Sequence, residues 1–541
     1  MKYSLYVFFS IILTTNALAQ DWQWVAQAEG TGYENIYSLC TDSSGNIYLT
    51  GDFYDQMFLG NDTLDAFGSE PTFFCKMDQN GNVQWGKKIG GYDNTFGISQ
   101  GAWAYPDIYS DTVLVISRMS GPNQNIGDCS LLLNGQGDHY EYHLTKVSSD
   151  GDCGWSQYHS NVNFRGLASD GAENLYCRLT VGQFSGNFHG VLLNTGTYLA
   201  KLSSLDGSLV WIKKMLDSPL YAVDILYGDG NLWLTGYTGG LSNFTLDTFT
   251  FPAISDEIFL AKIDTSASLQ WVNTFAAPTL NARGWAGVDN HGNSYVGGLY
   301  QDDYLFGDTS LTPDNTEELY LIKYNTQGER VWILSSISTG NLEFNNLVTD
   351  VDGNTVITGK FDGSITFGQH TLLAAGEDDG FVAKFDSSGN CIGAKSIENT
   401  FGLLLAAIDR QGSVIVGGSF EGTTNFDGIV LNSVGQSDVF VAKIDLKTAI
   451  PEYRLGEEDN QLFIYANPNK GQCTIDVPED FRYEDNLILR IFDTNGKLLR
   501  QTPLNMNQQQ LQLDLQQEAK GVYTATLSNG NKTYNGRIVF E

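Results

Sequence analysis

The fold is decided by residues 347–386, which read LVTDVDGNTVITGKFDGSITFGQHTLLAAGEDDGFVAKFD. An apolar segment runs into Asp350, a turn of the form Asp-x-x-Gly-Asn follows, and the β-branched segment TVITG comes next. A second apolar segment surrounds Lys384. Short apolar segments bounded by Asp and Gly predict strands joined by tight hairpin turns.

Most of the chain repeats this stretch, with two further anchors. A lysine recurs late in an apolar segment, and three successive intervals between these lysines are 61 residues each: Lys76, Lys146, Lys201, Lys262, Lys323, Lys384 and Lys443. A tryptophan follows the next glycine turn, with Cys391-Ile-Gly393 in the seventh place: Trp24, Trp85, Trp155, Trp211, Trp271 and Trp332. A fixed period of this kind indicates a repeat architecture.

Each unit supplies four antiparallel strands, and such units repeated radially form a β-propeller. A linear solenoid would need polar caps at both ends, and none is evident. The chain after residue 20 opens with a lone tryptophan strand, while the last unit ends at its lysine strand, Val439 to Asp445. We therefore predict an all-β protein whose residues 20–446 form a seven-bladed propeller closed by the N-terminal strand.

The two short, uniform turns of each unit fall on one face of such a ring, and the longer, variable connections fall on the other. Binding residues in rigid scaffolds concentrate on variable loops. We therefore expect any site on that face or in the central channel. Aromatic side chains there would suit sugars or peptides, unless they pack on their own blade: Tyr92, Trp103, Tyr105, Tyr300 and Tyr304.

The repeat resembles the bacterial β-propeller repeat family of secreted proteins, whose units read D-x-x-G-N-x-Y-x-x-G followed by F-x-x-K-x-D-x-x-G-x-x-x-W. The resemblance covers about residues 21–446. Units two and three depart from it, with Tyr140-Glu-Tyr-His143 and Tyr198-Leu-Ala where the lysine strand begins. Membership implies the fold and no particular activity.

The periodicity stops after Asp445. Residues 447–461 read as a linker, and the alternating apolar residues of 462–541 predict a small β-sandwich. The order of its motifs resembles the C-terminal sorting domain of the type IX secretion system, although Ala466 stands where that family often has proline: Asn467, Pro468, Gly471, Gly496, Gly521 and Tyr523. The resemblance implies the secretion machinery as a partner, and release or surface attachment afterwards. An ordinary accessory β-domain is the alternative.

The N-terminus predicts a secretory signal peptide, residues 1–19. Lys2 supplies the positive charge, a short apolar run follows, and Ala17-Leu-Ala19 forms a small-x-small cleavage site. No later run has the roughly 18 apolar residues that a membrane span needs. We expect an exported protein, extracellular or on the outer-membrane surface.

The formal net charge of −33 excludes nucleic acid and anionic membranes as partners, because both need a basic surface. Calcium would suit so acidic a chain, but no motif indicates it, because the Asp turns lack the alternating ligands of an EF-hand loop. We therefore expect no cofactor. The seven cysteines are an odd number without a C-x-x-C pair, so we expect mostly buried thiols in strands and assign no disulfide.

Catalytic motifs are missing: there is no Gly-x-Ser-x-Gly and no His-Glu-x-x-His. His139 and His143 lack a third metal ligand nearby, so we assign no metal site. Paired acids of the kind that glycosidases use are better explained as loop residues or as a recurring acidic position before the lysine: Asp302-Asp303, Glu317-Glu318 and Asp378-Asp379. The sequence thus favours a secreted or cell-surface binding module without catalytic residues. The alternative is an extracellular enzyme acting on polysaccharide or peptide at the channel mouth.

Overall fold

The computed structural model describes residues 22–446 and 462–540, apart from 67–70, 92–98, 107–111, 120–123, 127–128, 132–140, 218–222, 238–243, 247–248, 252–256, 277–284, 307–308, 314–316, 377, 463, 466–469, 479–480, 482–486, 494–496, 505–509, 517 and 530–531. The predicted signal peptide and linker lie outside these residues. The chain divides into two compact units, residues 1–450 and 451–541. All described elements of both units are strands, and no described helix is long and apolar enough to cross a membrane.

In the first unit, the described strands include seven antiparallel groups of four, which we call sheets 1 to 7. Sheets 1 to 3 are β2 (Glu34–Thr41), β3 (Ile47–Phe53), β6 (Thr72–Met77) and β7 (Val83–Gly91); β8 (Ser99–Pro106), β9 (Val113–Met119), β12 (Glu141–Val147) and β13 (Cys153–Ser160); and β14 (Asn163–Ser169), β15 (Asn174–Val181), β18 (Gly196–Ser203) and β19 (Leu209–Leu216). Sheets 4 and 5 are β20 (Val223–Gly228), β21 (Asn231–Tyr237), β24 (Glu257–Asp264) and β25 (Leu269–Ala276); and β26 (Trp285–Val288), β27 (Ser294–Tyr300), β30 (Glu318–Tyr324) and β31 (Arg330–Ser335). Sheets 6 and 7 are β33 (Leu342–Thr349), β34 (Thr355–Phe361), β37 (Asp379–Phe385) and β38 (Cys391–Ile397); and β39 (Thr400–Ile408), β40 (Val414–Phe426), β41 (Ile429–Ile444) and β1 (Trp22–Gly30).

Between the second and third strands of most sheets lies a small hairpin. These hairpins are β4 (Gln56–Leu59) with β5 (Asp62–Asp65), β10 (Gln124–Ile126) with β11 (Cys129–Leu131), β16 (Gly186–Phe188) with β17 (Val191–Leu193), β22 (Phe244–Leu246) with β23 (Phe249–Phe251), β28 (Tyr304–Phe306) with β29 (Thr309–Leu311), and β35 (Ser364–Phe367) with β36 (His370–Leu373). The short strand β32 (Ile337–Thr339) follows β31 and pairs with β35.

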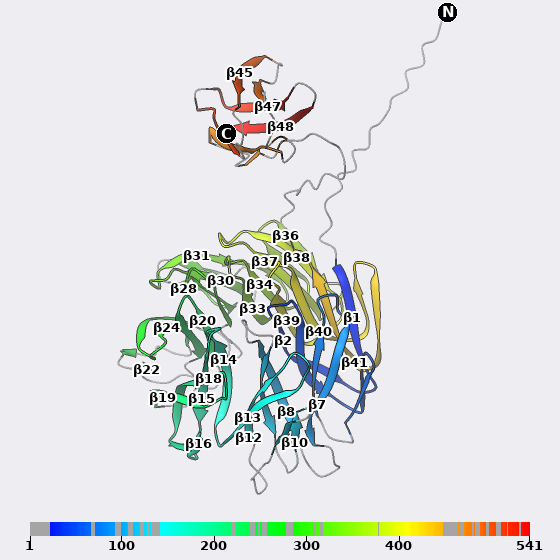
Figure 1. Cartoon of the computed structure of the whole chain (residues 1–541), viewed down its shortest axis with the longest axis vertical. Coiled ribbons are helices and arrows are strands. Elements are labelled where there is room, and N and C mark those ends of the chain that lie inside the picture. The colour runs from blue at the N-terminus through cyan, green and yellow to red at the C-terminus, as the bar shows by residue number, and fades with distance from the viewer. Residues whose placement is uncertain are drawn as a thin grey trace, which may run out of the picture. The chain divides into compact units, whose positions relative to one another are not determined.

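The first strands of the sheets succeed one another in a cycle. Each contacts the first strand of the next sheet, from β2 through β8, β14, β20, β26 and β33 to β39, and β39 in turn contacts β2. In Figure 1 the blue strand β1 lies beside the yellow strand β41, which separates it from β40. The apolar core lies between neighbouring sheets; one cluster, for example, joins Ile36 and Phe73 of sheet 1 to Ile415 and Val441 of sheet 7.

The N-terminal strand completes the last sheet. Strand β1 pairs antiparallel with β41, from Trp22 opposite Ile444 to Ala28 opposite Val439. Two segments more than 400 residues apart in the sequence thereby become neighbours in one sheet. The pairing also covers the edge that β41 would otherwise leave open.

The recurring lysine and tryptophan form a link between consecutive sheets, which we call the latch. The lysine lies in the third strand of a sheet and the tryptophan lies opposite it in the fourth strand. Both side chains donate hydrogen bonds to the same backbone oxygen, which belongs to the turn between the third and fourth strands of the next sheet. Lys323 Nζ and Trp332 Nε1 lie 2.8 and 3.3 Å from the oxygen of Ser387. The same arrangement joins Lys76 and Trp85 to Ser149, Lys146 and Trp155 to Ser204, and Lys262 and Trp271 to Thr326.

Each latch also requires a glycine in the receiving turn. At Gly328, with φ +80°, a Cβ atom would lie 2.8 Å from the indole of Trp271. Glycine is therefore needed there for its backbone conformation and for the close approach of the ring. The Asp of such turns is satisfied within the turn itself: Asp386 Oδ1 accepts the N–H groups of Ser388 and Asn390, both at 2.9 Å.

The strand register shows which residue holds the seventh tryptophan place. Lys384 is opposite Gly393, and Cys391 is opposite Phe385. No tryptophan is needed there, because sheet 7 has no turn between its third strand β41 and its fourth strand β1. Lys384 donates instead to the oxygen of Gly412, at 2.5 Å, in the turn between β39 and β40.

The sheet 7 to sheet 1 seam buries two carboxyl groups. Glu34 and Asp438 are both fully buried. Asp438 accepts hydrogen bonds from the backbone N–H of Gly30 at 3.1 Å, from Val434 at 2.9 Å and from the Gln27 amide at 2.5 Å. A Cβ on Gly30 would lie 2.0 Å from the carboxyl carbon of Glu34, so the carboxyl occupies the space that glycine leaves.

Burial and, after it, the neighbouring Asp438 carboxylate raise the pKa of Glu34 from 4.5 to about 8, whereas the hydrogen bond from the backbone N–H of Gly32 acts in the opposite direction. At neutral pH the folded protein therefore holds a proton on Glu34 that the unfolded chain releases.

The structure describes five free cysteines, for which the sequence predicted buried thiols in strands. Cys40, Cys75, Cys177 and Cys473 are buried and Cys391 is half-buried, all as free thiols in strands, which confirms the expected burial. Cys153 is disulfide-bonded, a bond that the sequence did not allow us to assign.

The second unit contains two sheets. One is β42 (Ile464–Tyr465), β43 (Gln472–Asp476) and β46 (Gln510–Asp514); the other is β45 (Leu498–Pro503), β44 (Ile488–Phe492), β47 (Gly521–Ser528) and β48 (Thr533–Phe540). Side chains of both sheets, such as Ile475 and Ala525, share one apolar core.

Three of the predicted sorting-domain residues fall within the described part of this unit. Gly471 has a φ of +102°, and its oxygen accepts the N–H of Leu515 at 2.6 Å. Gly521 begins β47, and Tyr523 is buried with its hydroxyl donating to the Ala519 oxygen. Asn467, Pro468 and Gly496 lie outside the described residues.

The latch predicts a stability cost at Trp332. Trp332→Ala removes the indole that packs on Gly389 and donates to Ser387, so we expect about 3–5 kcal/mol of destabilisation in urea unfolding followed by circular dichroism. Trp332→Phe, which loses only the donor, should cost about 1 kcal/mol. The exposed neighbour Val331→Ala should change stability by less than about 0.5 kcal/mol. Equal costs for Trp332→Ala and Val331→Ala would contradict the latch.

Glu34 predicts a pH dependence of stability. Because its folded-state pKa is raised, its contribution should be fully present below about pH 4.5 and lost as the pH rises toward 8. Glu34→Gln should flatten this part of the profile and stabilise the protein at pH 8 by on the order of 1–3 kcal/mol. Glu29→Gln, an exposed position in the same segment, is the control. Superimposable profiles for the wild type and Glu34→Gln would refute the proton assignment.

Candidate functional site

An aromatic cluster lies directly over the seam. Tyr33 is 40% exposed and Phe401 38% exposed, and their ring centres are 6.5 Å apart. Tyr54, which is half-buried, lies 6.3 Å from Tyr33 in an edge-to-face arrangement. We call these three residues the seam cluster. It presents apolar ring area with few rotatable bonds, as sites for sugars and peptides do.

The backbone holds the three rings together. Tyr33 precedes β2, Tyr54 follows β3, and Phe401 is the second residue of β39. The N–H of Tyr54 donates to the oxygen of Tyr33 at 3.1 Å. All three therefore lie at the connections between sheets or after second strands, on the face away from the Asp-Gly turns.

Glycines bring the segments of the seam close together. The Gln436 N–H donates to the oxygen of Gly32 at 2.7 Å, and a Cβ on Gly435 would lie 2.5 Å from the same oxygen. The ring of Tyr33 is thus attached to backbone fixed on both sides, by sheet 7 and by Tyr54. A pre-organised platform of this kind loses little entropy on binding a ligand.

None of the five aromatic residues predicted as ligand contacts belongs to the seam cluster. The expectation that Tyr300 is an exposed loop residue is wrong: it ends β27, is 1% exposed, and its hydroxyl donates to Glu318 at 2.8 Å. Trp103 and Tyr105 lie in strand β8, not in a loop, and the hydroxyl oxygen of Tyr105 accepts the Gly166 N–H at 3.3 Å. Tyr304 begins β28, and Tyr92 lies outside the described residues.

The acidic position before the lysine has a structural role. Glu318 accepts hydrogen bonds from Tyr300 and from the Ser335 hydroxyl at 3.0 Å. Asp379 accepts the N–H groups of Ala375 and Asn399 at 2.6 and 3.2 Å. Both are buried, whereas Asp302 and Asp303 are exposed. These contacts support the structural interpretation of the paired acids.

The histidine pair does not come together within the described residues, because His139 lies outside them. His143 is 2% exposed, and burial lowers its pKa to about 4. Its ring packs against Tyr158, with centres 5.5 Å apart. In the part of the chain that the structure describes, no group of three or more His, Cys, Asp or Glu could hold a metal ion.

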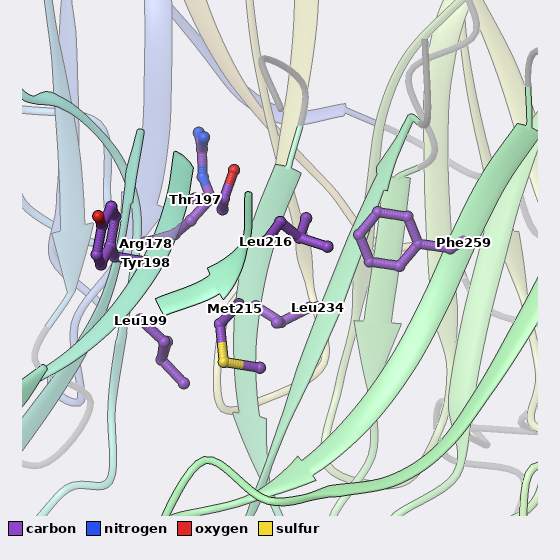
Figure 2. A pocket seen from close by; sticks show the side chains of 8 residues that line it. All are labelled: Arg178, Thr197, Tyr198, Leu199, Met215, Leu216, Leu234 and Phe259. Carbon is purple, nitrogen blue, oxygen red and sulfur yellow. The ribbon is translucent and has the colours of Figure 1, made fainter. Parts of the chain in front are cut away.

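A small cavity lies beside the buried guanidinium of Arg178 in sheet 3. Figure 2 shows Arg178 next to Thr197, with the apolar side chains of Leu216, Leu234 and Phe259 on the other side. Burial raises the pKa of Asp224 in sheet 4, and the Arg178 guanidinium partly offsets this rise. The cavity measures about 10 Å³, which is room for about one water molecule. It is too small for a ligand.

The seam cluster could not be found from the sequence, because its members are far apart and follow no motif. Tyr33 and Phe401 are 368 positions apart (401 − 33). The usable signal was the predicted closure itself: joining the N-terminal strand to the last unit places residues after β1 beside those that begin β39.

Comparisons with known proteins agree with this architecture. Residues 463–541 match the family described as the secretion system C-terminal sorting domain, and residues 23–52 match the β-propeller repeat. An uncharacterized WD repeat-containing protein of Acanthamoeba polyphaga mimivirus is 29% identical over 121 residues, which cover 20% of this chain and only 9% of that protein.

Similar solved structures include propeller proteins. BamB from Moraxella catarrhalis is 13% identical with a TM-score of 0.31, over 77% of this chain and 90% of that one. The Dos1 propeller is 8% identical with a TM-score of 0.36, over 78% and 95%. Likeness this distant says nothing of a ligand. The two family matches support a β-propeller repeat protein with a C-terminal sorting domain of the type IX secretion system.

Proposed function

We propose that the first unit is a closed seven-bladed propeller and the second a β-sandwich. The cycle of contacts from β2 back through β39 supports the first proposal, as does the pairing of β1 with β41. The apolar core shared by two sheets supports the second. The predicted boundaries, with the propeller at 20–446, a linker at 447–461 and the sorting domain at 462–541, fit the division of the chain after residue 450.

On this scaffold we propose a binding function: the protein is a secreted or cell-surface recognition module whose seam cluster contacts an extracellular glycan or protein. The observation that carries the proposal is the grouping of Tyr33, Tyr54 and Phe401 as neighbouring, partly exposed rings over a rigid seam. The sorting domain indicates where the partner would be met, at the cell surface or outside the cell.

The chemistry of the seam favours an uncharged face of the ligand. The carboxyl of Glu34 is buried and, with its pKa raised to about 8, holds a proton at neutral pH. Glu34, the residue directly after Tyr33, therefore adds no charge beside the cluster, even though the chain carries a net charge of −33. Ring stacking on a sugar or an apolar peptide segment needs no such charge.

The predicted site residue Trp103 is kept as a second candidate for ligand contact, because β8 is the first strand of sheet 2. No observation favours the alternative that the protein is an extracellular enzyme, and this alternative stays a prediction. Calcium binding likewise stays a prediction.

We expect the seam cluster to determine affinity. A screen of the full chain on glycan and peptide arrays, with and without calcium, should give a specific ligand that Tyr33→Ala and Phe401→Ala each weaken at least tenfold, about 1.4 kcal/mol. Phe184→Ala, at another exposed aromatic position (70%), is the matched control and should leave affinity unchanged. A ligand indifferent to both seam variants, or sensitive to Trp103→Ala instead, would move the site away from the cluster.

The sorting domain predicts a change in location on truncation. A chain that ends at residue 446 should stay inside the cell envelope, because it lacks the segment that the secretion system reads, while the full chain reaches the surface or the medium. Fractionation and protease accessibility of intact cells measure this. Circular dichroism of the truncated chain controls for folding, and surface exposure of a folded truncated chain would contradict the role of residues 463–541.

A further inference from the structure

A second place on the first unit has the features of a binding site. A cavity of about 520 Å³ opens between sheet 5 and sheet 6. It is bounded by the end of β31 (Leu334 and Ser335), by the turn of the β35–β36 hairpin (residues 367–370) and by the start of β38. Its size falls in the range of ligand sites.

The lining of this cavity carries no carboxylate, ammonium or guanidinium group. Its polar groups are the hydroxyls of Ser335 and Ser336, the amides of Gln369 and Asn390, and the imidazole of His370; the rest are apolar residues, glycines and the Cys391 thiol. Burial raises the pKa of Cys391 to about 12, so its thiol stays neutral. On a chain of net charge −33, such a neutral lining favours an uncharged occupant.

The cavity borders an open strand edge. Among the described strands β31 pairs with β30 alone. The Ser336 N–H donates to the Leu319 oxygen of β30 at 2.9 Å. Because backbone groups in an antiparallel pair alternate in direction, those of Ile333 and Ser335 face away from β30 and toward the open edge.

The fold itself uses this kind of edge for strand addition. The fourth strands β1, β7 and β13 each pair, near their ends, with a hairpin of the following sheet, as Ile89 does with Ile126. In sheet 5 the corresponding hairpin pairs beyond β31, where Ile337 is opposite Thr366. The stretch of β31 before that point remains available beside the cavity.

The cavity has an apolar wall that includes Phe367 and Leu334. Two strands that contribute to the cavity also carry exposed apolar side chains: Val331 on β31 is 54% exposed, and Leu373 on β36 is 72% exposed. An extended segment paired with β31 would direct every second side chain to the face of the sheet on which the cavity opens, since side chains of a strand point alternately to its two faces.

We propose that the cavity between sheets 5 and 6 binds an extended, uncharged peptide segment of a partner protein, which adds as a strand to the edge of β31 and places an apolar side chain in the cavity. Recognition by strand addition takes affinity from backbone hydrogen bonds and specificity from pockets for alternate side chains. This site is separate from the seam cluster and does not depend on it.

The test is selection from a displayed library of random linear peptides on the full chain, followed by affinity and hydrogen-exchange measurements with the synthetic peptide selected. We expect uncharged apolar sequences, and slowed exchange of the β31 amides on binding. Gln369→Glu, which puts a charge into the lining, should weaken affinity at least tenfold. Gln327→Glu, the same change at an exposed position outside the cavity, is the matched control.

A second variant addresses the strand edge directly. Ile333→Pro removes an N–H that the same alternation directs to the open edge, where proline is tolerated, so binding should fall while the fold is kept. Tyr33→Ala should leave peptide binding unchanged, so this variant distinguishes the proposed peptide site at the cavity from the proposed ligand site at the seam cluster. Absence of any selected peptide would overturn the proposal. So would a peptide insensitive to Gln369→Glu, or a neutral glycan that protects residues 367–370 without β31.

Discussion

The latch between consecutive sheets is the constraint on which the rest of the first unit depends. One backbone oxygen, such as that of Ser387, accepts both the Lys323 ammonium and the Trp332 indole, so a single turn fixes the third and fourth strands of the preceding sheet. A carbonyl oxygen has two lone pairs and can take both donors. Because donors and acceptor belong to different sheets, the contact specifies how neighbouring sheets pack, which intra-sheet pairing alone does not.

The same constraint explains where the repeat breaks. Sheet 7 borrows its fourth strand from the N-terminus, so it has no turn to receive a tryptophan, and the residue opposite Lys384 is Gly393. At the seam between sheets 7 and 1 only the tryptophan half of the latch is kept: Trp24 donates to the Gln79 oxygen of sheet 1 at 3.2 Å, whereas Lys443 bonds to Asp409 of its own sheet at 2.7 Å. Asp438, which accepts three donors, adds further contacts there. Sequence positions freed from the repeat's demands are those where irregular residues such as Tyr33 and Phe401 gather.

The sequence was sufficient for features that recur and insufficient for those that occur once. Lys323 and Trp332 could be recognised as architecture because the lysine recurs seven times along the chain and the tryptophan six times. Tyr300 was misjudged, because a tyrosine near the predicted end of a strand looks the same whether its ring faces solvent or, as here, the buried carboxyl of Glu318. The seam cluster and the cavity beside β31 arise from tertiary contacts between distant segments, and periodicity contains no information on these.

The overall charge makes uncharged recognition the more selective option for this molecule. With a net charge of −33, cations are attracted over the whole surface and anions are repelled from it, so charge alone distinguishes poorly between partners. Discrimination then has to come from shape, ring stacking and backbone hydrogen bonds. The seam cluster, above a protonated Glu34, and the cavity beside β31, lined without a charged side chain, both offer contacts of this kind. Two such neutral places on one acidic scaffold are what a surface-displayed recognition protein would need in order to bind selectively.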